Sequence, residues 1–221
     1  MSESDEDEMQ FNTESYKDVK TWQDLIDINV KYLKGEIKNT FYTCGSIHNE
    51  TTPLLPKLFK LHELGFMTEC GQPADIYIDS TDKTWIDDED GDCGDWTYEE
   101  HQKSFVFGYM PIILADKLKE YLDKCDNIIY KISYPNFIFE TNMQNKSYNL
   151  TKSKILKQHG KDIENPEWKN LTNSKNEHTF EWSDIPNVDN ILETCCSVEI
   201  IYNKYGEGSA EDVLIKFFET N

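Results

Sequence analysis

The segment from Ser104 to Met110 constrains the fold more than any other part of the sequence. Its letters, SFVFGYM, are mostly aromatic or β-branched, and Pro111 ends the run, which is typical of a β-strand. After Pro111, apolar side chains recur at helical spacing as far as Leu122, and this periodicity predicts an amphipathic helix. The centre of the chain is therefore expected to form a strand followed at once by a helix.

Two further helices are expected near the start of the chain. One begins at Thr21 or Lys20, has an acidic first turn with Asp24 and ends at Lys34, before Gly35. The other begins at Pro53, runs through a series of leucines and ends at Gly65. A shorter helix is predicted over residues 188–194.

Short apolar or alternating runs predict the other strands. They lie at 66–70, 75–79, 128–134, 137–139, 179–182, 197–202 and 213–218, and Tyr205-Gly206-Glu207-Gly208 is expected to join the last two as a hairpin. Helices come early, strands cluster, and the two do not alternate regularly. This order favours an α+β fold, with a mainly antiparallel sheet and three to four helices packed on it.

Charge divides the chain into segments. The 221 residues carry 42 acidic side chains against 22 basic ones, a net charge of −20. Residues 1–20 hold seven acids and two lysines, residues 75–100 hold eleven acids and one lysine, and residues 146–176 hold seven lysines and three acids. We expect a disordered acidic tail at 1–19 and a single α+β domain at 20–221, with an exposed acidic loop at 82–95 and an aperiodic, lysine-rich insertion at 142–176.

All 22 basic side chains are lysines, so the sequence contains no arginine. Arginine is the preferred residue for bidentate contacts with phosphate and for reading guanine. Its absence disfavours nucleotide-phosphate chemistry and sequence-specific DNA binding. Together with 17 asparagines, it also indicates the coding bias of an AT-rich genome, such as that of a large DNA virus of protists, or of an AT-rich protist or bacterium.

The sequence shows no sign of secretion. The first residues, MSESDEDEMQ, lack the basic and apolar regions of a signal peptide, and no apolar stretch approaches the roughly 18 residues that span a bilayer. The six cysteines show no C-x-x-C spacing, so reduced thiols are expected. We expect an intracellular protein of the cytoplasm or of a virion, without membrane contact.

Several fragments between residues 21 and 122 occur in a characteristic order. They are Trp22–Gly35, Thr52–Leu58, Gly65–Thr68, Gln72-Pro73 and Gln102–Gly108. In this order they resemble an uncharacterised family of small, mostly bacterial domains of unknown function, with relatives among giant-virus proteins. The resemblance implies no activity, since none is established for the family.

The same resemblance points to a group of binding candidates. It implies that four residues lie close together at strand ends, with a role that is unknown: Gln72, Pro73, Gln102 and Lys103. Lys103 stands where arginine is expected in relatives, which weakens an anion-binding interpretation of this corner.

Cys44, His48 and Cys70 are the residue types of a cysteine-dependent active site. An imidazole activates a thiol as a nucleophile, and a nearby amide such as that of Gln72 can stabilise an oxyanion. The simpler interpretation is that these cysteines are small core residues. Cys44, His48 and Cys70 could also hold zinc together with Cys93 or His101, although the chain lacks the closely spaced cysteine pairs of most zinc sites.

The acidic run on either side of Gly91 is the part of the sequence that calcium would favour. Its candidate ligands are Asp87, Asp88, Asp90 and Asp92. Ile86 and Thr97 would occupy the first and last ligand positions of an EF-hand, which excludes that motif. A solvated acidic loop is the alternative, and no cofactor other than calcium is expected.

These observations favour a non-enzymatic interaction protein, associated with the virion or the infected cytoplasm of a large DNA virus. Its acidic tail and loop would attract a protein partner with a basic surface. The lysine-rich segment 142–176 could instead bind the acidic tail of a second copy, which would give a homo-oligomer.

Other functions remain open. The first alternative is a cysteine-dependent hydrolase or transferase that uses Cys44 or Cys70 with His48. The second is an inhibitor that imitates nucleic acid and binds a basic partner. Aromatic residues interleaved with lysines at 128–134 and 146–157 could also stack on single-stranded nucleic acid, although the negative charge of the rest of the chain opposes it.

Overall fold

The computed structural model describes residues 16–40, 47, 49–81, 96–135, 139–142, 149–158, 161–171 and 188–221. The helices are α1 (Trp22–Leu33), η3 (Asn49–Leu54), α2 (Leu55–Glu63), η4 (Ile112–Leu114), α3 (Ala115–Leu122), α4 (Val188–Leu192) and α5 (Ala210–Thr220). The strands are β1 (Met67–Gln72), β2 (Asp75–Thr81), β3 (Trp96–Pro111), β4 (Ile128–Ser133), β5 (Phe139–Thr141), β6 (Thr151–Gln158), β7 (Lys161–Asp162), β8 (Lys169–Leu171) and β9 (Cys195–Tyr205). All the described strand pairs are antiparallel, so the expected α+β fold is confirmed.

One long strand, β3, connects all parts of the sheet. Its C-terminal half pairs with β1 on one edge and β9 on the other, and its N-terminal half pairs with β2 and β6. Strands β4 and β5 extend the sheet beyond β9, whereas β7 and β8 both pair with β6. We call the first group (β1, β4, β5, β9 and 103–111 of β3) the body and the second (β2, β6, β7, β8 and 96–102 of β3) the arm.

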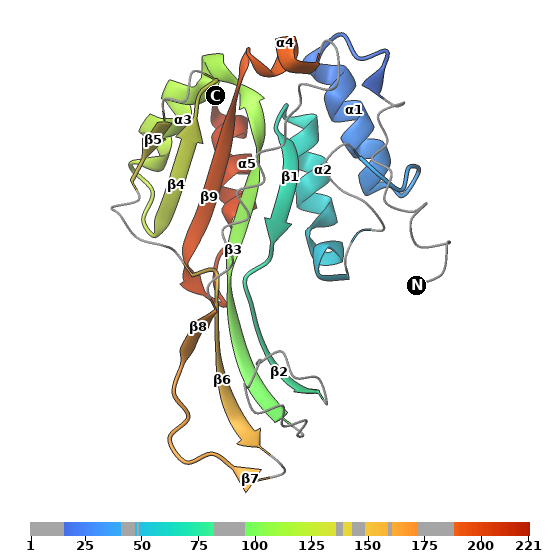
Figure 1. The fold of residues 1–221 in the computed structure, drawn as a ribbon. Coiled ribbons are helices and arrows are strands. Elements are labelled where there is room, and N and C mark those ends of the chain that lie inside the picture. Colours follow the sequence, from blue (N-terminus) through green and yellow to red (C-terminus); the bar gives the residue numbers. More distant parts are fainter. Residues whose placement is uncertain are drawn as a thin grey trace.

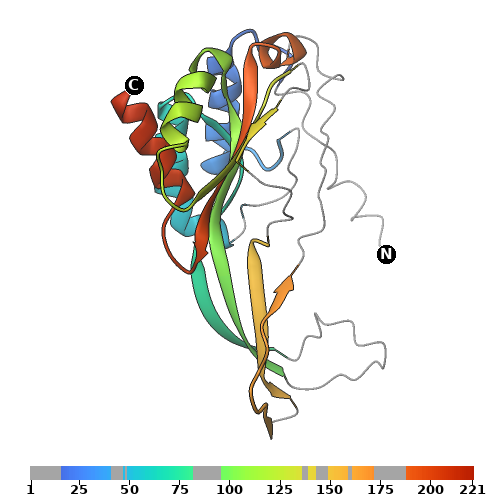
Figure 2. The same ribbon diagram turned by 90° about the vertical axis from the view of Figure 1, so that its left-hand side faces the viewer.

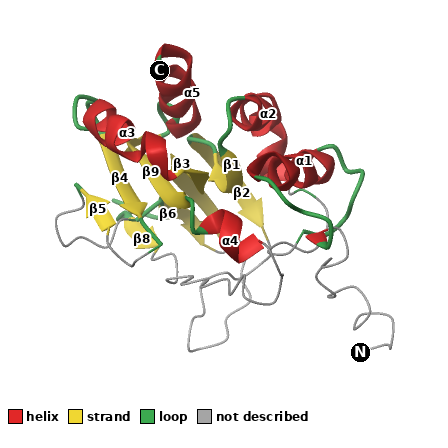
Figure 3. Ribbon diagram, turned by 90° about the horizontal axis from the view of Figure 1, so that it is seen from above, coloured by secondary structure: helices red, strands yellow, loops and turns green. Residues whose placement is uncertain are grey.

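The helices cover the body. Figure 3 shows α1, α2, α3 and α5 on one side of the sheet and α4 on the other, and Figures 1 and 2 show the arm extending beyond the helices. The alternating residues Val106 and Met110 of β3 and Val198 and Ile200 of β9 are buried in the main core under these helices. Alternation is the pattern of a sheet with one covered face.

A second core lies beside β1 and corrects the expected boundary of the acidic tail. Tyr16 is fully buried and Val19 is 2% exposed, and both pack with Leu25 of α1, Met67 of β1 and Val188 of α4. The large apolar area of these two side chains stabilises this core. The expectation of a tail as far as residue 19 was therefore wrong for residues 16–19, while residues 1–15 lie outside the described residues.

The predicted early helices are confirmed. Thr21 is the N-cap of α1, where its side chain and that of Asp24 form a capping box, and Lys34 is the C-cap. The helix expected from Pro53 is divided into η3 and α2, and Gly65, with a φ of 89°, follows it. A left-handed residue after the last turn is most easily supplied by glycine.

The strand expected at 213–218 was wrong, because this segment is part of α5. Ser209 caps the helix through the N–H of Asp212, and Ala210, Leu214 and Phe217 are buried at helical spacing. The run of β-branched and aromatic residues imitates a strand, but the cap and the buried spacing favour a helix. The expected hairpin at 205–208 is therefore the connection from β9 to α5.

The aperiodic insertion expected at 142–176 was also wrong, since β6, β7 and β8 lie within it. Strand β6 pairs with seven residues of β3, from Trp96 to Gln102. No apolar alternation marks β6, because the arm extends beyond the helices and neither of its faces has to be apolar. Backbone pairing and side-chain contacts between strands hold it instead.

Other expected elements have mixed outcomes. The strands at 66–70, 75–79, 128–134 and 197–202 and the helix at 188–194 are found with limits no more than three residues from those expected. The strand expected at 137–139 is found as β5, three residues long from Phe139. The strand expected at 179–182 and the acidic loop at 82–95 lie outside the described residues.

Gly108 allows β1 to lie against β3. A Cβ at this position would be 2.2 Å from the carbonyl oxygen of Met67 and 2.7 Å from the ring of Phe66. Both atoms belong to the segment that enters β1, so neither can move without shifting the strand. The glycine is therefore a packing requirement and not a turn signal.

We expect Gly108→Ala to lower the free energy of unfolding by about 3 kcal/mol, because the methyl group overpacks a backbone contact. Gly71→Ala in β1 is the matched control, since a Cβ there meets its nearest atoms at an ordinary 3.7 Å, and it should change stability by less than about 1 kcal/mol. Denaturant unfolding measures both variants. Equal stabilities would contradict the packing role of Gly108.

Candidate functional site

The residues predicted from the sequence to carry chemistry are only partly described. Cys44, His48 and Cys93, and the calcium candidates Asp87, Asp88, Asp90 and Asp92, lie outside the described residues. Within the described ranges, no group of three or more His, Cys, Asp or Glu side chains could hold a metal ion. The catalytic, zinc and calcium hypotheses for these residues stay predictions.

Cys70 is a free cysteine exposed on β1. The pKa of its thiol is raised, first by the protein atoms that surround it and then by the neighbouring carboxylate of Glu69. An activated nucleophile needs the opposite shift, because the thiolate is the reactive form. Its surroundings therefore disfavour the use of Cys70 as a nucleophile.

We expect Cys70 to react with iodoacetamide at pH 7.5 more slowly than the thiol of N-acetylcysteine, because less of it is ionised. Peptide mapping by mass spectrometry follows the reaction, and unfolding in guanidinium should remove the difference from the free thiol. If Cys70 in the folded chain reacted faster than N-acetylcysteine, the result would support Cys70 as a catalytic nucleophile.

Glu69 is a titratable residue that sequence reasoning missed. It is the extra residue of a β-bulge between Thr68 and Cys70, and burial raises the pKa of its carboxyl to about 7, although a hydrogen bond with Tyr109 opposes the shift. Its Oε2 has no partner among the described side chains. The only signal in the sequence was a charged residue inside an apolar run, and bulges often turn such a side chain toward a site.

Stability should respond to the titration of Glu69. Since the pKa of about 7 in the folded chain exceeds the ordinary glutamate pKa of 4.5, the stabilising contribution is complete below pH 4.5 and is lost as the pH rises through 7. Between pH 5 and pH 8 we expect the wild type to lose about 2 kcal/mol of stability relative to Glu69→Gln. Denaturant unfolding at both pH values tests this, and the exposed Glu120→Gln should show no such difference.

The junction of body and arm brings the family-motif residues together. The amide of Gln72 donates a hydrogen bond of 3.1 Å to the carbonyl oxygen of Lys103, and Pro73 and Gln102 line one pocket. The resemblance implied that these residues lie close together, which the contacts agree with. Gln72 is the last residue of β1 and Pro73 lies between β1 and β2, as expected for strand ends. Gln102 and Lys103 lie opposite them in the interior of β3 and not at its end.

The pocket at this junction, which we call the junction pocket, has a volume of about 380 Å³. Its lining residues are Asn49, Pro53, Pro73, Asp75, Tyr77 and Gln102. The hydroxyl of Tyr77 donates to Oε1 of Glu100 at 2.5 Å, and the amide of Gln102 donates to the same oxygen at 3.2 Å. Glu100 is only 9% exposed, so two neutral donors stabilise a carboxylate behind the wall of the pocket.

The opposite face of the arm carries lysines and aromatic rings. Strand periodicity places Glu100 and Gln102 on one face of β3 and Glu99, His101 and Lys103 on the other. His101, a zinc candidate by sequence, lies 2.7 Å from Oε1 of Glu99 and packs its ring 4.5 Å from that of Trp168. It is held by an acid and a ring, which is the arrangement of a structural histidine.

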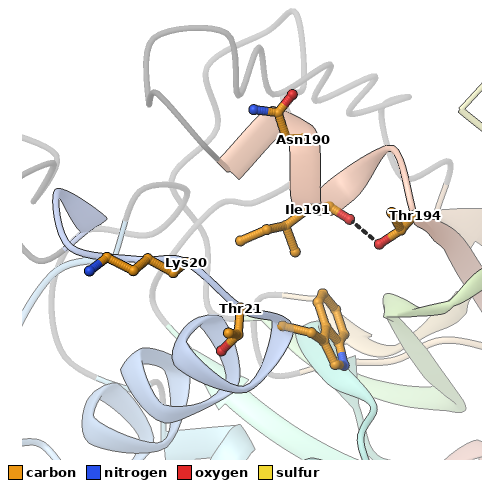
Figure 4. A pocket seen from close by; sticks show the side chains of 6 residues that line it. Lys20, Thr21, Asn190, Ile191 and Thr194 are labelled. Atoms are coloured by element: carbon orange, nitrogen blue, oxygen red, sulfur yellow. Dashed lines mark hydrogen bonds between the residues drawn. The ribbon is translucent and has the colours of Figure 1, made fainter.

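A larger pocket, of about 570 Å³, lies between the start of α1 and α4 (Figure 4). Thr194 donates to the carbonyl oxygen of Ile191, and the backbone N–H groups of Lys20 and Thr21 both donate to Asp24. The donors at this helix start are therefore already used. The polar side chains of Lys20 and Asn190 also line this pocket, but no buried carboxylate with two hydrogen-bond donors, such as Glu100, stands beside them among the described residues, so the junction pocket is the better candidate site.

Comparison with protein-family models finds no match, and comparison with curated proteins finds no relative. The resemblance to a domain family of unknown function therefore stays a prediction. In the described parts of the chain, no helix has both the length and the apolar character to cross a membrane.

Proposed function

We propose that this protein is a non-enzymatic interaction protein and that the junction pocket receives a positively charged side chain of a basic protein partner. It would act in the virion or the infected cytoplasm of a large DNA virus, one of the AT-rich sources that fit its amino-acid usage. The observation that carries the proposal is the chemistry of the pocket wall. Asp75 and Gln102 line it, Glu100 stands behind it, and none of the described lining residues is a lysine.

The carboxylate of Asp75 is the exposed charge of this pocket. Its Oδ1 accepts the backbone N–H of Ile76 at 2.7 Å, which fixes the side chain and leaves the second oxygen for a ligand. Pro53 and Pro73 are rigid, weakly polar walls that suit the methylene stem of a lysine. An ammonium group entering between them would meet an anchored carboxylate and amide oxygens.

The charge of the chain supports the same partner. Asp75 is the first residue of the region 75–100, which contains eleven acidic residues and one lysine. A dense negative region raises the rate at which a basic surface arrives, whereas the contacts of the pocket decide where it binds. A cysteine-dependent enzyme is less favoured, because the one described member of its proposed catalytic group, Cys70, has a raised thiol pKa.

The test uses pentalysine as the probe and isothermal titration calorimetry in 150 mM salt. Asp75→Asn should weaken binding at least fivefold, because it removes the anchored charge of the pocket. Asp116→Asn changes the same charge at an exposed position on α3 and should weaken binding less than twofold. Equal effects of the two variants would show a diffuse attraction to the whole surface and would contradict a role for the pocket.

A further inference from the structure

Lysines and aromatic rings form a cluster where the arm meets the body, on the face opposite that of Glu100 and Gln102. We call this the lysine–aromatic cluster: Lys103 of β3, Lys152 and Lys154 of β6, Trp168 before β8 and Tyr205 of β9. The ammonium groups of Lys103 and Lys152 lie 4.6 and 4.5 Å from the ring centre of Tyr205. Those of Lys152 and Lys154 lie 4.2 and 4.5 Å from that of Trp168. Five side chains from four segments thus make one continuous contact surface.

The positive charge of this cluster is not balanced. Lys154 is paired with Glu99 at 2.7 Å, but Lys103 donates to the neutral amide oxygen of Asn203 at 2.8 Å. Among the described residues, neither Lys103 nor Lys152 has a carboxylate partner. The ammonium groups of Lys103 and Lys152 lie beside the same ring of Tyr205 and carry like charges, and the pKa of Lys103 is lowered by burial and by the charge of Lys152.

Two ammonium groups held beside the same ring favour an anion that neutralises both. The aromatic rings position the lysines, since a cation is attracted to a ring face. The ammonium N–H groups that do not point at a ring or at Asn203 can donate hydrogen bonds to the acceptor atoms of a ligand. Both rings are already contacted by two lysines each, and His101 packs against Trp168. This leaves little ring surface for stacking nucleic-acid bases, so the carboxylates of an acidic peptide fit the cluster better.

We propose that the lysine–aromatic cluster binds the acidic segment of residues 1–15 of the same chain. This segment contains six acids and no lysine, so its charge is complementary to that of the cluster. It is joined to Tyr16, which is buried in the second core. Fifteen extended residues reach up to about 50 Å, roughly the length of the 16-residue strand β3, so the segment can reach the cluster.

Binding within one chain is favoured over binding between copies. Each chain carries a net charge of −20, so two copies repel each other before any contact forms. A tethered segment meets no such repulsion from a second molecule, and its effective concentration near the cluster is in the millimolar range.

The test uses full-length chains and a fluorescent synthetic peptide of residues 1–15. In one chain the six acids of residues 1–15 are changed to amides, which removes the competing charge from the segment. This neutralised chain should bind the peptide in 50 mM salt at least tenfold more tightly than the wild type, in which the cluster is occupied. Binding should weaken steeply with added salt.

Variants of the neutralised chain locate the binding site. Lys152→Gln, alone and with Lys103→Gln, should weaken peptide binding at least tenfold, and Lys152→Arg should preserve it because the charge remains. Lys117→Gln with Lys124→Gln removes the same charge from exposed positions in and after α3 and should have less than a twofold effect. Circular dichroism confirms that each variant is folded, and the single Lys152→Gln variant decides the test if the double variant is not.

Four results would overturn the proposal. The first is that the wild-type and neutralised chains bind the peptide equally well, and the second is that Lys152→Gln leaves the affinity for the peptide unchanged. The third is that a 15-nucleotide poly-dT binds more tightly than the peptide at the same salt. The fourth is that the wild-type chain forms a dimer in sedimentation and the neutralised chain does not. The third would favour nucleic acid as the ligand, and the fourth would favour a second copy. None of them depends on the junction pocket.

Discussion

The structure depends on the pairing of β3 along both of its edges. A strand of 16 residues spans body and arm, and every other described strand pairs with it directly or through β4, β6 or β9. The helix-side packing of the body requires β1 to lie close to β3 at Gly108. Ser104 links the same strand to α5, because its hydroxyl accepts the N–H of Ala210 and donates to Glu211. The last helix and the first strands are thereby fixed to one element.

The alternation of β3 gives the arm two chemically different faces. On one face, Gln102 lines the junction pocket and Glu100 lies behind its wall, and none of the described lining residues is a lysine. On the other, Lys103 joins a cluster in which positive charge exceeds negative charge. The described helices lie over the body and not over the arm, so the two faces offer groups of opposite charge outside the helix-covered core. A protein that binds one kind of partner while holding its own acidic segment on the reverse side is consistent with this arrangement.

The sequence predicted the elements whose signals are local. Thr21 and Asp24 form the capping box that their spacing indicates, and Phe105 to Tyr109 lie in the central strand that their composition indicates. It failed where a local signal was ambiguous, as at Val213 to Phe218, where bulky apolar residues fit a strand as well as a helix. It also failed at β6, which shows no apolar alternation because the arm extends beyond the helices and neither of its faces packs into a core. The junction pocket combines residues from η3, β2 and β3. The lysine–aromatic cluster combines residues from β3, β6, β9 and the segment before β8. No short sequence motif could predict that such distant segments lie together.

The sequence alone determined the α+β class, the early helices, the central strand and the separation of acidic from lysine-rich segments, because periodicity, caps and charge are properties of neighbouring residues. Only the tertiary structure decided that Glu69 has a raised pKa, that Gln72 meets Lys103, and that Lys103 and Lys152 share the ring of Tyr205. These features arise from burial and from contacts between residues far apart in the chain, such as Lys103 and Tyr205. Such contacts depend on which strands pair, and strand pairing is settled by the packing of the whole chain.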